Sequence, residues 1–384
     1  MKIEKVNVHK ICLPFTGDFS ISRKKGTCAN NVVVELVADQ GEIDGYGEGA
    51  PVEFVTGETQ EGVAKSVSSF VQKNSFPWEL DDVSQIWDFI DSLPKGKENN
   101  AAICAVEMAL LDLLGKRQNK SLTDYFPKDF YTNKVCYGAA ITLGNKQRIM
   151  EICGLINNLG ITDLRIKLGS NFEQNKDAIE TVGLMCGDDC DLRIDPNGVW
   201  DRDLAFKHVP LIEKYNIKVV EEPMSTLDSG FIEFAGLMKS YGVILMACET
   251  APTLGDVERI IRDGYYEMIN VKLSRSGGFR RSLRIIERIR SSNLSFQIGC
   301  TLGESGILSA AGRALSLLCH DAAYYDGSYD RYMLKENTTT EGVSFGPGGE
   351  AGPLDGPGLG VEIDRESLMR LSNGSATVTI SNPL

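Results

Sequence analysis

The sequence predicts a (β/α) barrel of the TIM type next to an α+β capping domain, and two observations support this fold class. From about residue 134 onward, short apolar runs alternate with helical segments, which is the pattern of parallel strand–helix–strand units. A charged residue also closes each of several consecutive apolar runs, at positions 167, 195, 221, 249 and 272, so the spacings are 28, 26, 28 and 23 residues. One strand, one helix and two short loops occupy about that much chain.

The predicted barrel occupies residues 131–335. Its strands are expected to end near Gly144, Lys167, Asp195, Glu221, Cys248, Lys272, Cys300 and Asp326. These eight ends are enough to close a barrel, with one or two irregular helices in the outer ring. Helices are expected, for example, over residues 201–215, 253–263, 277–290 and 304–318. Residues at the carboxyl ends of such strands lie at the face that carries the chemistry.

Residues 1–130 are expected to form the capping domain. Strands are predicted in "KIEKVNVHKICLPF" and "NNVVVELVAD", and helices in "ETQEGVAKSVSSFVQ" and "NNAAICAVEMALLDLLGKRQ". Because Gly62 stands three residues after Thr59, the first helix is predicted from its periodicity and not from a cap, whereas Gly115 is expected to end the second. Residues 336–384 are expected to return to the capping domain, and disorder is the alternative for their Gly- and Pro-rich part.

Composition narrows the class of protein. With 384 residues the chain is long enough for two domains, and its net charge of -13 disfavours nucleic acid. No apolar run reaches the roughly 18 residues of a membrane span, and "MKIEKVNVHK" lacks the apolar stretch of a secretion signal. The ten cysteines are scattered, which favours free thiols in a reducing compartment. We expect a cytoplasmic protein that binds neither nucleic acid nor a membrane.

Three carboxylates at consecutive strand ends predict a metal site. Asp195, Glu221 and Glu249 offer the hard oxygen ligands that Mg²⁺ prefers. Each one alone would more often be an ion-pair partner or a helix cap. Together they are expected to converge on the barrel axis, where three like charges repel one another unless a cation lies between them. Asn197 either orients this site or makes the turn that follows the strand.

Lys167 and Lys272 come before and after these carboxylates in strand order. A cation flanked by two lysines suits removal of a proton next to a carboxylate, with a lysine on each face to take or give the proton. Arg165 is expected to share the space of Lys167 and to lower its pKa by repulsion. Glu304 either hydrogen-bonds a substrate or lysine, or caps a helix. For each lysine alone, a simple ion pair is the alternative.

These motifs resemble the enolase superfamily, in particular its muconate-lactonizing-enzyme branch. The matching residues are Arg165-Ile-Lys167, Asp195-Pro-Asn197, Glu221-Glu222-Pro223, Cys248-Glu249, and Lys272 followed by Gly277-Gly278; "GYGEGAP" and "VTGET" resemble its capping domain. The resemblance covers nearly the whole chain. It implies one Mg²⁺ ion, with Asp195, Glu221 and Glu249 as metal ligands, Lys167 and Lys272 as catalytic residues, and Arg165, Asn197 and Glu304 in support.

Two positions depart from the pattern of that branch. Cys248 stands where its third metal ligand, an Asp, is expected, and a thiol is a poor Mg²⁺ ligand; Glu249 is therefore assigned that role. Its dipeptide epimerases end the eighth strand with Asp-x-Asp, which holds a substrate ammonium. Here the run is Asp326-Gly-Ser328, so half of that clamp is missing. Asp326 is expected to bind substrate, and Asp330 is the alternative for the missing half, although its register differs.

The resemblance implies a Mg²⁺-dependent isomerase that moves the proton next to a carboxylate, most simply a racemase or epimerase of an amino-acid derivative or dipeptide. An o-succinylbenzoate synthase or a muconate-type cycloisomerase is the alternative, and an inactive barrel that binds a ligand is another. Expected partners are a small carboxylate substrate and further copies of the chain. Residues 17–30 and 51–58 are expected over the barrel mouth, where Arg23, Lys24 and Lys25 either attract an acidic substrate or are merely solvated.

Overall fold

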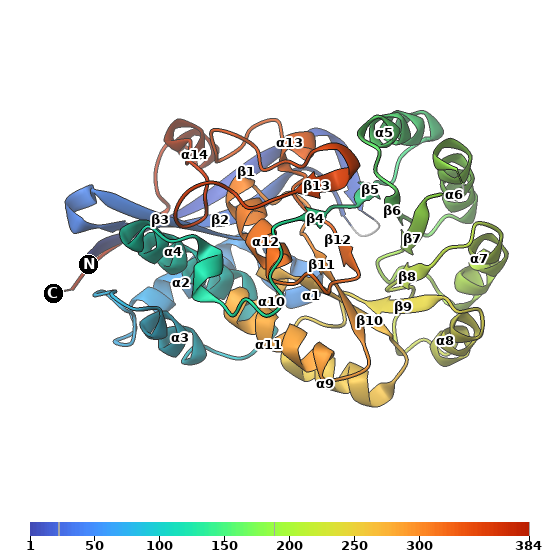
Figure 1. The fold of residues 1–384 in the computed structure, drawn as a ribbon, viewed down its shortest axis with the longest axis horizontal. Coiled ribbons are helices and arrows are strands. Elements are labelled where there is room, and N and C mark those ends of the chain that lie inside the picture. Colours follow the sequence, from blue (N-terminus) through green and yellow to red (C-terminus); the bar gives the residue numbers. More distant parts are fainter. Residues whose placement is uncertain (22–23, 188, 384) are drawn as a thin grey trace.

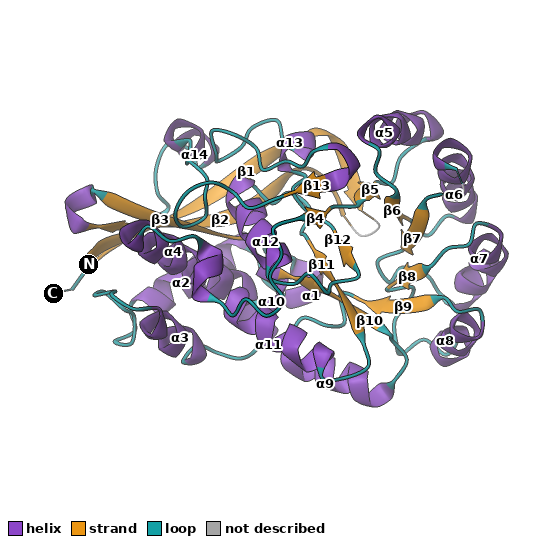
Figure 2. Ribbon diagram, viewed as in Figure 1, coloured by secondary structure: helices purple, strands orange, loops and turns teal. Residues whose placement is uncertain are grey.

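The structure is a computed structural model that describes residues 1–21, 24–187 and 189–383. Figure 1 shows two bodies side by side: an antiparallel sheet with its helices, beside which both termini lie, and a curved parallel sheet. In Figure 2 the strands of the second body form an inner layer and its helices an outer one. No helix of the described residues is long and apolar enough to cross a membrane.

Eight strands of the described chain form the curved sheet, each parallel to the next and in chain order. They are β5 (Ala139–Ile141), β6 (Asp163–Lys167), β7 (Asp191–Asp195), β8 (Val219–Glu221), β9 (Ile244–Ala247), β10 (Met268–Lys272), β11 (Ser295–Gly299) and β12 (Tyr324–Tyr325). The backbone N–H of Gly138 donates to the carbonyl of Tyr325 at 2.8 Å, which joins the two outer strands. The barrel predicted from the sequence is confirmed.

Helices cover the outer side of this sheet (Figure 1). They are α5 (Lys146–Leu159), α6 (Phe172–Cys186), α7 (Arg202–Lys214), α8 (Phe231–Ser240), α9 (Leu254–Asp263), α11 (Phe279–Arg290) and α12 (Gly306–Leu317). Two single-turn helices, α10 (Leu273–Ser276) and α13 (Asp330–Met333), follow β10 and β12. The expected irregularity of the outer ring therefore falls mainly on its last unit.

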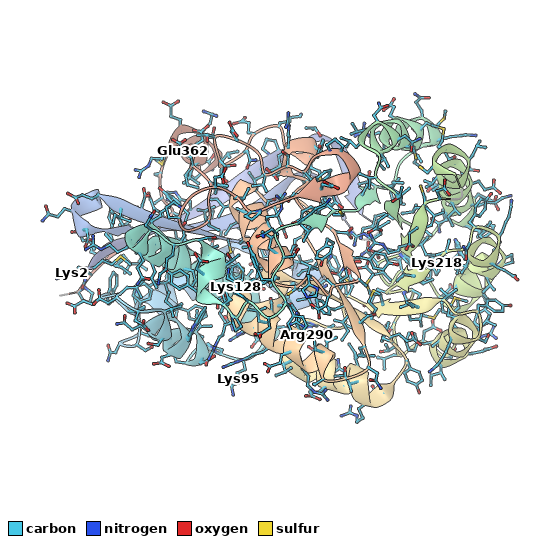
Figure 3. All side chains as sticks on the ribbon, viewed as in Figure 1. Lys2, Lys95, Lys128, Lys218, Arg290 and Glu362 are labelled. Atoms are coloured by element: carbon cyan, nitrogen blue, oxygen red, sulfur yellow. The ribbon has the colours of Figure 1, made fainter. Side chains whose placement is uncertain are left out.

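Alternation along the strands separates the two faces of the sheet. Arg165 and Lys167 on β6 contact carboxylates of other strands, so their face is the barrel interior; Leu164 and Ile166 lie on the opposite face, toward the helices. Ion pairs fill much of this interior. Arg193 is fully buried and contacts both Asp163 and Asp326. By contrast, Lys95, Lys218 and Glu362, which are labelled in Figure 3, have exposed side chains.

The capping sheet has the strand order β14-β1-β2-β3 within the described residues. Its strands are β1 (Ile3–Ile21), β2 (Lys24–Ala38), β3 (Ile43–Gly49) and β14 (Val378–Ser381). Because β14 pairs antiparallel with β1, the C-terminal segment completes the capping sheet. The smaller elements are β4 (Val135–Cys136), β13 (Glu350–Ala351), α1 (Glu53–Thr56), α14 (Arg365–Leu371) and 3-10 turns at Asp39–Gly41, Lys97–Asn99, Leu122–Tyr125 and Pro347–Gly349. Domain boundaries at residues 130 and 335 stay a prediction.

The capping helices are α2 (Gln60–Val71), α3 (Val83–Asp91) and α4 (Asn100–Gln118); the structure adds a cap to α2 and overturns the expected end of α4. The Thr59 side chain does cap α2, because it accepts from the N–H of Gly62 at 3.1 Å and such a cap needs only a backbone donor. Gly115 does not end α4, which continues to a left-handed Asn119. A Cβ on Gly115 would lie 2.7 Å from the Cα of Gly358, so this glycine allows close packing of the C-terminal segment.

Glu48 ties the capping sheet to the barrel. Its neighbour Gly47 lies directly on α4, where a Cβ would come 2.0 Å from the carbonyl oxygen of Ala105. Glu48 therefore points the other way, to the start of α12. Its carboxylate accepts from the hydroxyl of Ser305 at 2.6 Å, from the backbone N–H groups of Ser305 and Leu308 at 3.1 and 3.0 Å, and from Asn31 at 2.6 Å.

We expect Glu48→Gln to loosen this junction, because an amide nitrogen would replace one oxygen and face donors. Loss of one or two bonds to a charged acceptor corresponds to about 2–4 kcal/mol of stability. Thermal unfolding followed by circular dichroism checks this, with the exposed Glu42→Gln as matched control. An unchanged midpoint for Glu48→Gln would show that the junction does not depend on this carboxylate.

Candidate active site

The residues selected from the sequence lie at the carboxyl ends of neighbouring barrel strands. Lys167 ends β6 and faces Asp195, its partner at the end of β7 in the strand register. The Lys167 ammonium pairs with Asp195 Oδ2 and donates to Asn197 Oδ1 at 3.1 Å. Asn197 takes a left-handed φ of 51° in the turn after β7. It therefore makes the turn and also orients the site.

Asp195 and Glu221 are fully buried. Asp195 Oδ1 accepts from the N–H of Asn197 at 2.9 Å, and Glu221 accepts from Asn270 at 2.7 Å and from Arg165 at 3.0 Å. Burial and the nearby Glu221 charge raise the pKa of Asp195 to about 6. Burial also opposes the charge of Glu221, but Arg165, Lys167 and Lys272 hold the pKa of Glu221 well below its ordinary value.

Glu249 has one engaged and one unengaged oxygen. Oε1 accepts from Asn197 Nδ2 at 2.9 Å, whereas Oε2 is buried and has no hydrogen-bond partner in the structure. Asn197 thus links Glu249 to Asp195. A buried carboxylate oxygen without a donor is unfavourable in a protein interior, and a cation would satisfy it.

The thiol of Cys248 contacts an arginine and is not suited to be a metal ligand. Its Sγ accepts from Arg275 Nη1 at 2.8 Å, and burial raises the pKa of this thiol well above its ordinary value. A neutral thiol is a poor ligand for a hard cation. Arg275 was missed in the sequence, although it stands three residues after Lys272.

The three carboxylates fit a divalent cation by their donor chemistry and by the unsatisfied oxygen of Glu249. In the part of the chain that the structure describes, however, no group of three or more His, Cys, Asp or Glu side chains is gathered as a metal cage. Arg165 and Lys167 instead contact Glu221 and Asp195. Positive side chains therefore balance these acids.

The lysines differ in their surroundings. Lys272 ends β10 and is half-buried in the cavity wall; burial lowers its pKa, but Cys248 and Glu221 outweigh burial and raise it above its ordinary value. Arg165 does share the cavity with Lys167. Its charge is nevertheless compensated by Glu221 and by Asp326, whose Oδ2 lies 3.2 Å from Arg165 Nε. These two carboxylates therefore reduce the repulsion between Arg165 and Lys167 that their spacing predicts.

Asp326 is engaged within the protein, and its expected contact with a substrate stays a prediction. Its carboxylate faces the barrel interior, where it meets Arg165, Arg193 at 3.1 Å and Gln297 at 2.9 Å. With these partners, little acceptor capacity is left for a substrate ammonium. Ser328 is engaged as well, because it accepts from Arg313 at 2.9 Å.

Glu304 lies behind the cavity loop at residues 300–302. It accepts from the N–H of Thr301, and burial with the charge of Glu48 raises its pKa to about 8. Helix α12 is capped by Ser305, which accepts from the N–H of Ile307 at 3.3 Å. Glu304 is thus not the helix cap, and its role toward a substrate stays a prediction. The basic run Arg23–Lys25 lies outside the residues whose side chains the structure describes.

Glu222 holds the loop that carries Cys248 and Glu249. It has a left-handed φ of 42° and accepts from the N–H of Cys248 at 2.7 Å and from the hydroxyl of Thr250 at 3.1 Å. Burial and the Glu249 charge raise its pKa to about 8. The sequence contained Glu222 only as part of a motif, without a signal for this role.

Above these residues lies a cavity of about 610 Å³. Its charged lining residues include Arg165, Lys167, Glu249, Lys272 and Arg275. Capping-domain segments complete it, with Phe15, Ala29 and residues 51–55 in its wall. The site is therefore built by both bodies of the molecule, as expected for loops over a barrel mouth.

Known proteins resemble the whole chain. Residues 150–367 match the family model described as enolase C-terminal domain-like, and residues 5–126 match that of the mandelate racemase / muconate lactonizing enzyme N-terminal domain. The hydrophobic dipeptide epimerase of Enterococcus faecalis is 28% identical over 94% of this chain and 99% of its own. The L-Ala-D/L-Glu epimerase of Clostridium acetobutylicum is 24% identical over 94% and 99%.

Solved structures share the fold of this chain. The N-succinyl Arg/Lys racemase of Bacillus cereus superposes with a TM-score of 0.85 at 21% identity, over the full length of both chains. The Enterococcus faecalis dipeptide epimerase, complexed with Mg and the dipeptide L-Leu-L-Tyr, superposes with a TM-score of 0.82 at 25% identity, over 94% of this chain and 100% of its own. The chain belongs to the muconate-lactonizing-enzyme branch of the enolase superfamily, whose relatives here are epimerases, racemases and cycloisomerases.

Proposed function

We propose that the chain is a Mg²⁺-dependent isomerase that moves the proton on the carbon next to a substrate carboxylate and so racemises or epimerises an amino-acid derivative. One observation carries the proposal: lysines from β6 and β10 line the same cavity, and strands β7–β9 between them present Asp195, Glu221 and Glu249. A base on each side of an anion-stabilising centre is what a reversible change of configuration needs.

Lys167 and Lys272 would act on opposite faces of the substrate. The neutral amine of one lysine takes the proton, and the ammonium of the other delivers one to the opposite face. Lys167 is held by Asn197 and Asp195, which fixes the direction of its amine. Asn197 and Glu222 act as positioning residues, because they hold Glu249 and the loop that carries it.

Asp195, Glu221 and Glu249 would hold the metal. When bound, Mg²⁺ would supply positive charge beside the carboxylate oxygens on which negative charge develops. The proposal draws support from the relatives crystallised with Mg and a dipeptide. A cycloisomerase is the second candidate, because chloromuconate cycloisomerases also match, at 23% identity for that of Pseudomonas; in that case a single lysine controls proton transfer.

Asp195→Asn and Glu221→Gln should each lower kcat/KM by about 10³-fold, because loss of a metal ligand removes several kcal/mol of charge stabilisation. Calorimetric titration with Mg²⁺ should show weakened binding, and circular dichroism an unchanged fold. Asp203→Asn, an exposed carboxylate on α7, is the control. Full activity of either site variant after chelation and dialysis into metal-free buffer would contradict the metal assignment.

Glu249→Gln should weaken Mg²⁺ binding far more than Cys248→Ser. The serine keeps an acceptor for Arg275, and the thiol that it replaces contributes little to a hard cation. Parallel Mg²⁺ titrations and kcat/KM measurements on the two variants check this order. The reverse order would place the third ligand at position 248.

Proton exchange in heavy water distinguishes two bases from one. Lys167→Ala should slow deuterium uptake from one enantiomer by about 10²–10⁴-fold, because the base for that enantiomer is lost. Lys272→Ala should slow uptake from the other enantiomer by a similar factor. Each variant keeps slow exchange of the isomer whose base remains. Nuclear magnetic resonance of both enantiomers with both variants measures this. Dependence on one lysine alone, with a ring or double bond in the product, would favour the cycloisomerase instead.

A further inference from the structure

The cavity has an apolar wall beyond the charged strand ends. Helix α5 contributes Ile152, Leu155, Ile156 and Leu159 to the lining. Their spacing of three, four and seven residues places them on one face of the helix. Leu155 is 47% exposed, and Ile152 and Leu159 are half-buried. Ile156 is buried together with Ile149 and Cys153, whereas Met150 is 38% exposed. The lining residues therefore widen the buried apolar face of α5 into a stripe that is incompletely covered at Leu155.

An aromatic cluster forms another part of the wall. Tyr329, Tyr332 and Phe345, from the chain after β12, all line the cavity. The rings of Tyr332 and Phe345 are 5.6 Å apart, and those of Tyr329 and Phe345 are 6.3 Å apart. The Tyr329 hydroxyl donates to the carbonyl of Gly138 at 2.7 Å, so its one polar group is already engaged.

The apolar wall adjoins the proposed catalytic centre. Ala140 of β5 lines the cavity and lies opposite Arg165 in the strand register. Ala139 and Thr142 on the same segment also line it. Small side chains on β5 leave room between the charged strand ends and the stripe on α5, so one extended molecule can reach both.

Charge decides what kind of molecule fits. Among the described residues, the acidic side chains that line the cavity are Glu53 and Glu249, against Arg148, Arg165, Lys167, Lys272 and Arg275. Glu53 is exposed on α1, Glu249 is proposed for the metal, and Asp326 is engaged by arginines. A substrate ammonium would enter a mostly cationic and apolar cavity without a buried carboxylate to receive it, which is unfavourable.

We infer that the substrate is an N-acylated amino acid whose acyl group is a long, uncharged hydrocarbon chain lying between α5 and the Tyr329–Phe345 cluster. The inference rests on the proposed function for the reacting end of the molecule. The amino-acid carboxylate meets the cationic strand ends, the amide nitrogen carries no charge, and the hydrocarbon chain covers the apolar stripe.

The test uses N-acetyl-, N-hexanoyl- and N-decanoyl-phenylalanine, with deuterium uptake at the α-carbon as the readout. We expect kcat/KM to rise about fourfold for each methylene that is buried. The free dipeptide L-Leu-L-Tyr should be the poorer substrate by at least tenfold. Equal kcat/KM for all chain lengths, or a preference for the free dipeptide that Glu53→Gln removes, would overturn the inference.

Variants locate the binding of the chain. Leu155→Glu should lower the ratio of kcat/KM for the decanoyl over the acetyl compound by about tenfold or more. Leu184→Glu, at an 82% exposed leucine on α6, should leave both values unchanged. An unchanged ratio in the Leu155 variant would overturn the placement on α5. Circular dichroism of each variant verifies the fold.

Calorimetry separates this inference from the proposed function. N-decanoyl-glycine titrated into the Lys167→Ala/Lys272→Ala protein should bind at least tenfold more tightly than N-acetylglycine, even if the wild-type protein exchanges no proton. If binding depends on chain length but the wild-type protein exchanges no proton, the isomerase proposal is wrong and the inference of an apolar site holds. If the wild-type protein exchanges the proton but chain length has no effect on binding, the isomerase proposal holds and the inference of an apolar site is wrong.

Discussion

Arg165 and Arg193 place two positive charges in the barrel interior, and each pairs with the carboxylate of Asp326, which directly follows β12. Arg193 also reaches Asp163, and Arg165 reaches Glu221. Burying an unpaired ion costs several kcal/mol, so breaking one of these pairs leaves a charge that the interior tolerates poorly. The pairs link β6, β7 and β8 to the end of β12. These pairs therefore fix the relative positions of the strand ends that carry the site residues.

The cavity divides its tasks between different parts of the chain. The charged residues stand on barrel strands that are tied together by the interior ion pairs, whereas the apolar wall comes from α5, the capping domain and the segment after β12. Glu222 supports the charged part of the cavity, because its carboxylate fixes the loop that brings Glu249 to the cavity. The residues that fix the geometry of the charged centre are thus largely separate from those of the apolar wall, which we infer to select the substrate.

Much of this architecture could be predicted from local pattern. The strands end at Lys167, Asp195, Glu221 and Lys272 as predicted, and elsewhere within three residues of the predicted ends, because apolar runs of fixed spacing specify parallel units. What the sequence did not reveal depends on partners distant along the chain. Gly115 lies inside α4 and gives Gly358 room to pack against the helix, and Asp326 is engaged by an arginine 133 residues away.

Cys248 and Arg275 illustrate the same limit within the site. The unusual thiol was visible in the sequence, but the guanidinium that binds it comes from the next strand–helix unit, so the pair emerges only from the fold. Similarly, repulsion between Arg165 and Lys167 follows from their spacing alone, and it is reduced once Glu221 and Asp326 are in place.

The pairing of β14 with β1 places residues 378–381 beside residues 5–8. During synthesis on the ribosome, the edge of β1 that pairs with β14 therefore stays unpaired until residues 378–381 have been made. An open strand edge invites pairing with other chains, and contacts so distant in sequence form slowly. The capping body begins the chain but is completed after the barrel strands have been made. The nascent chain thus carries an unpaired strand edge until residues 378–381 have been made.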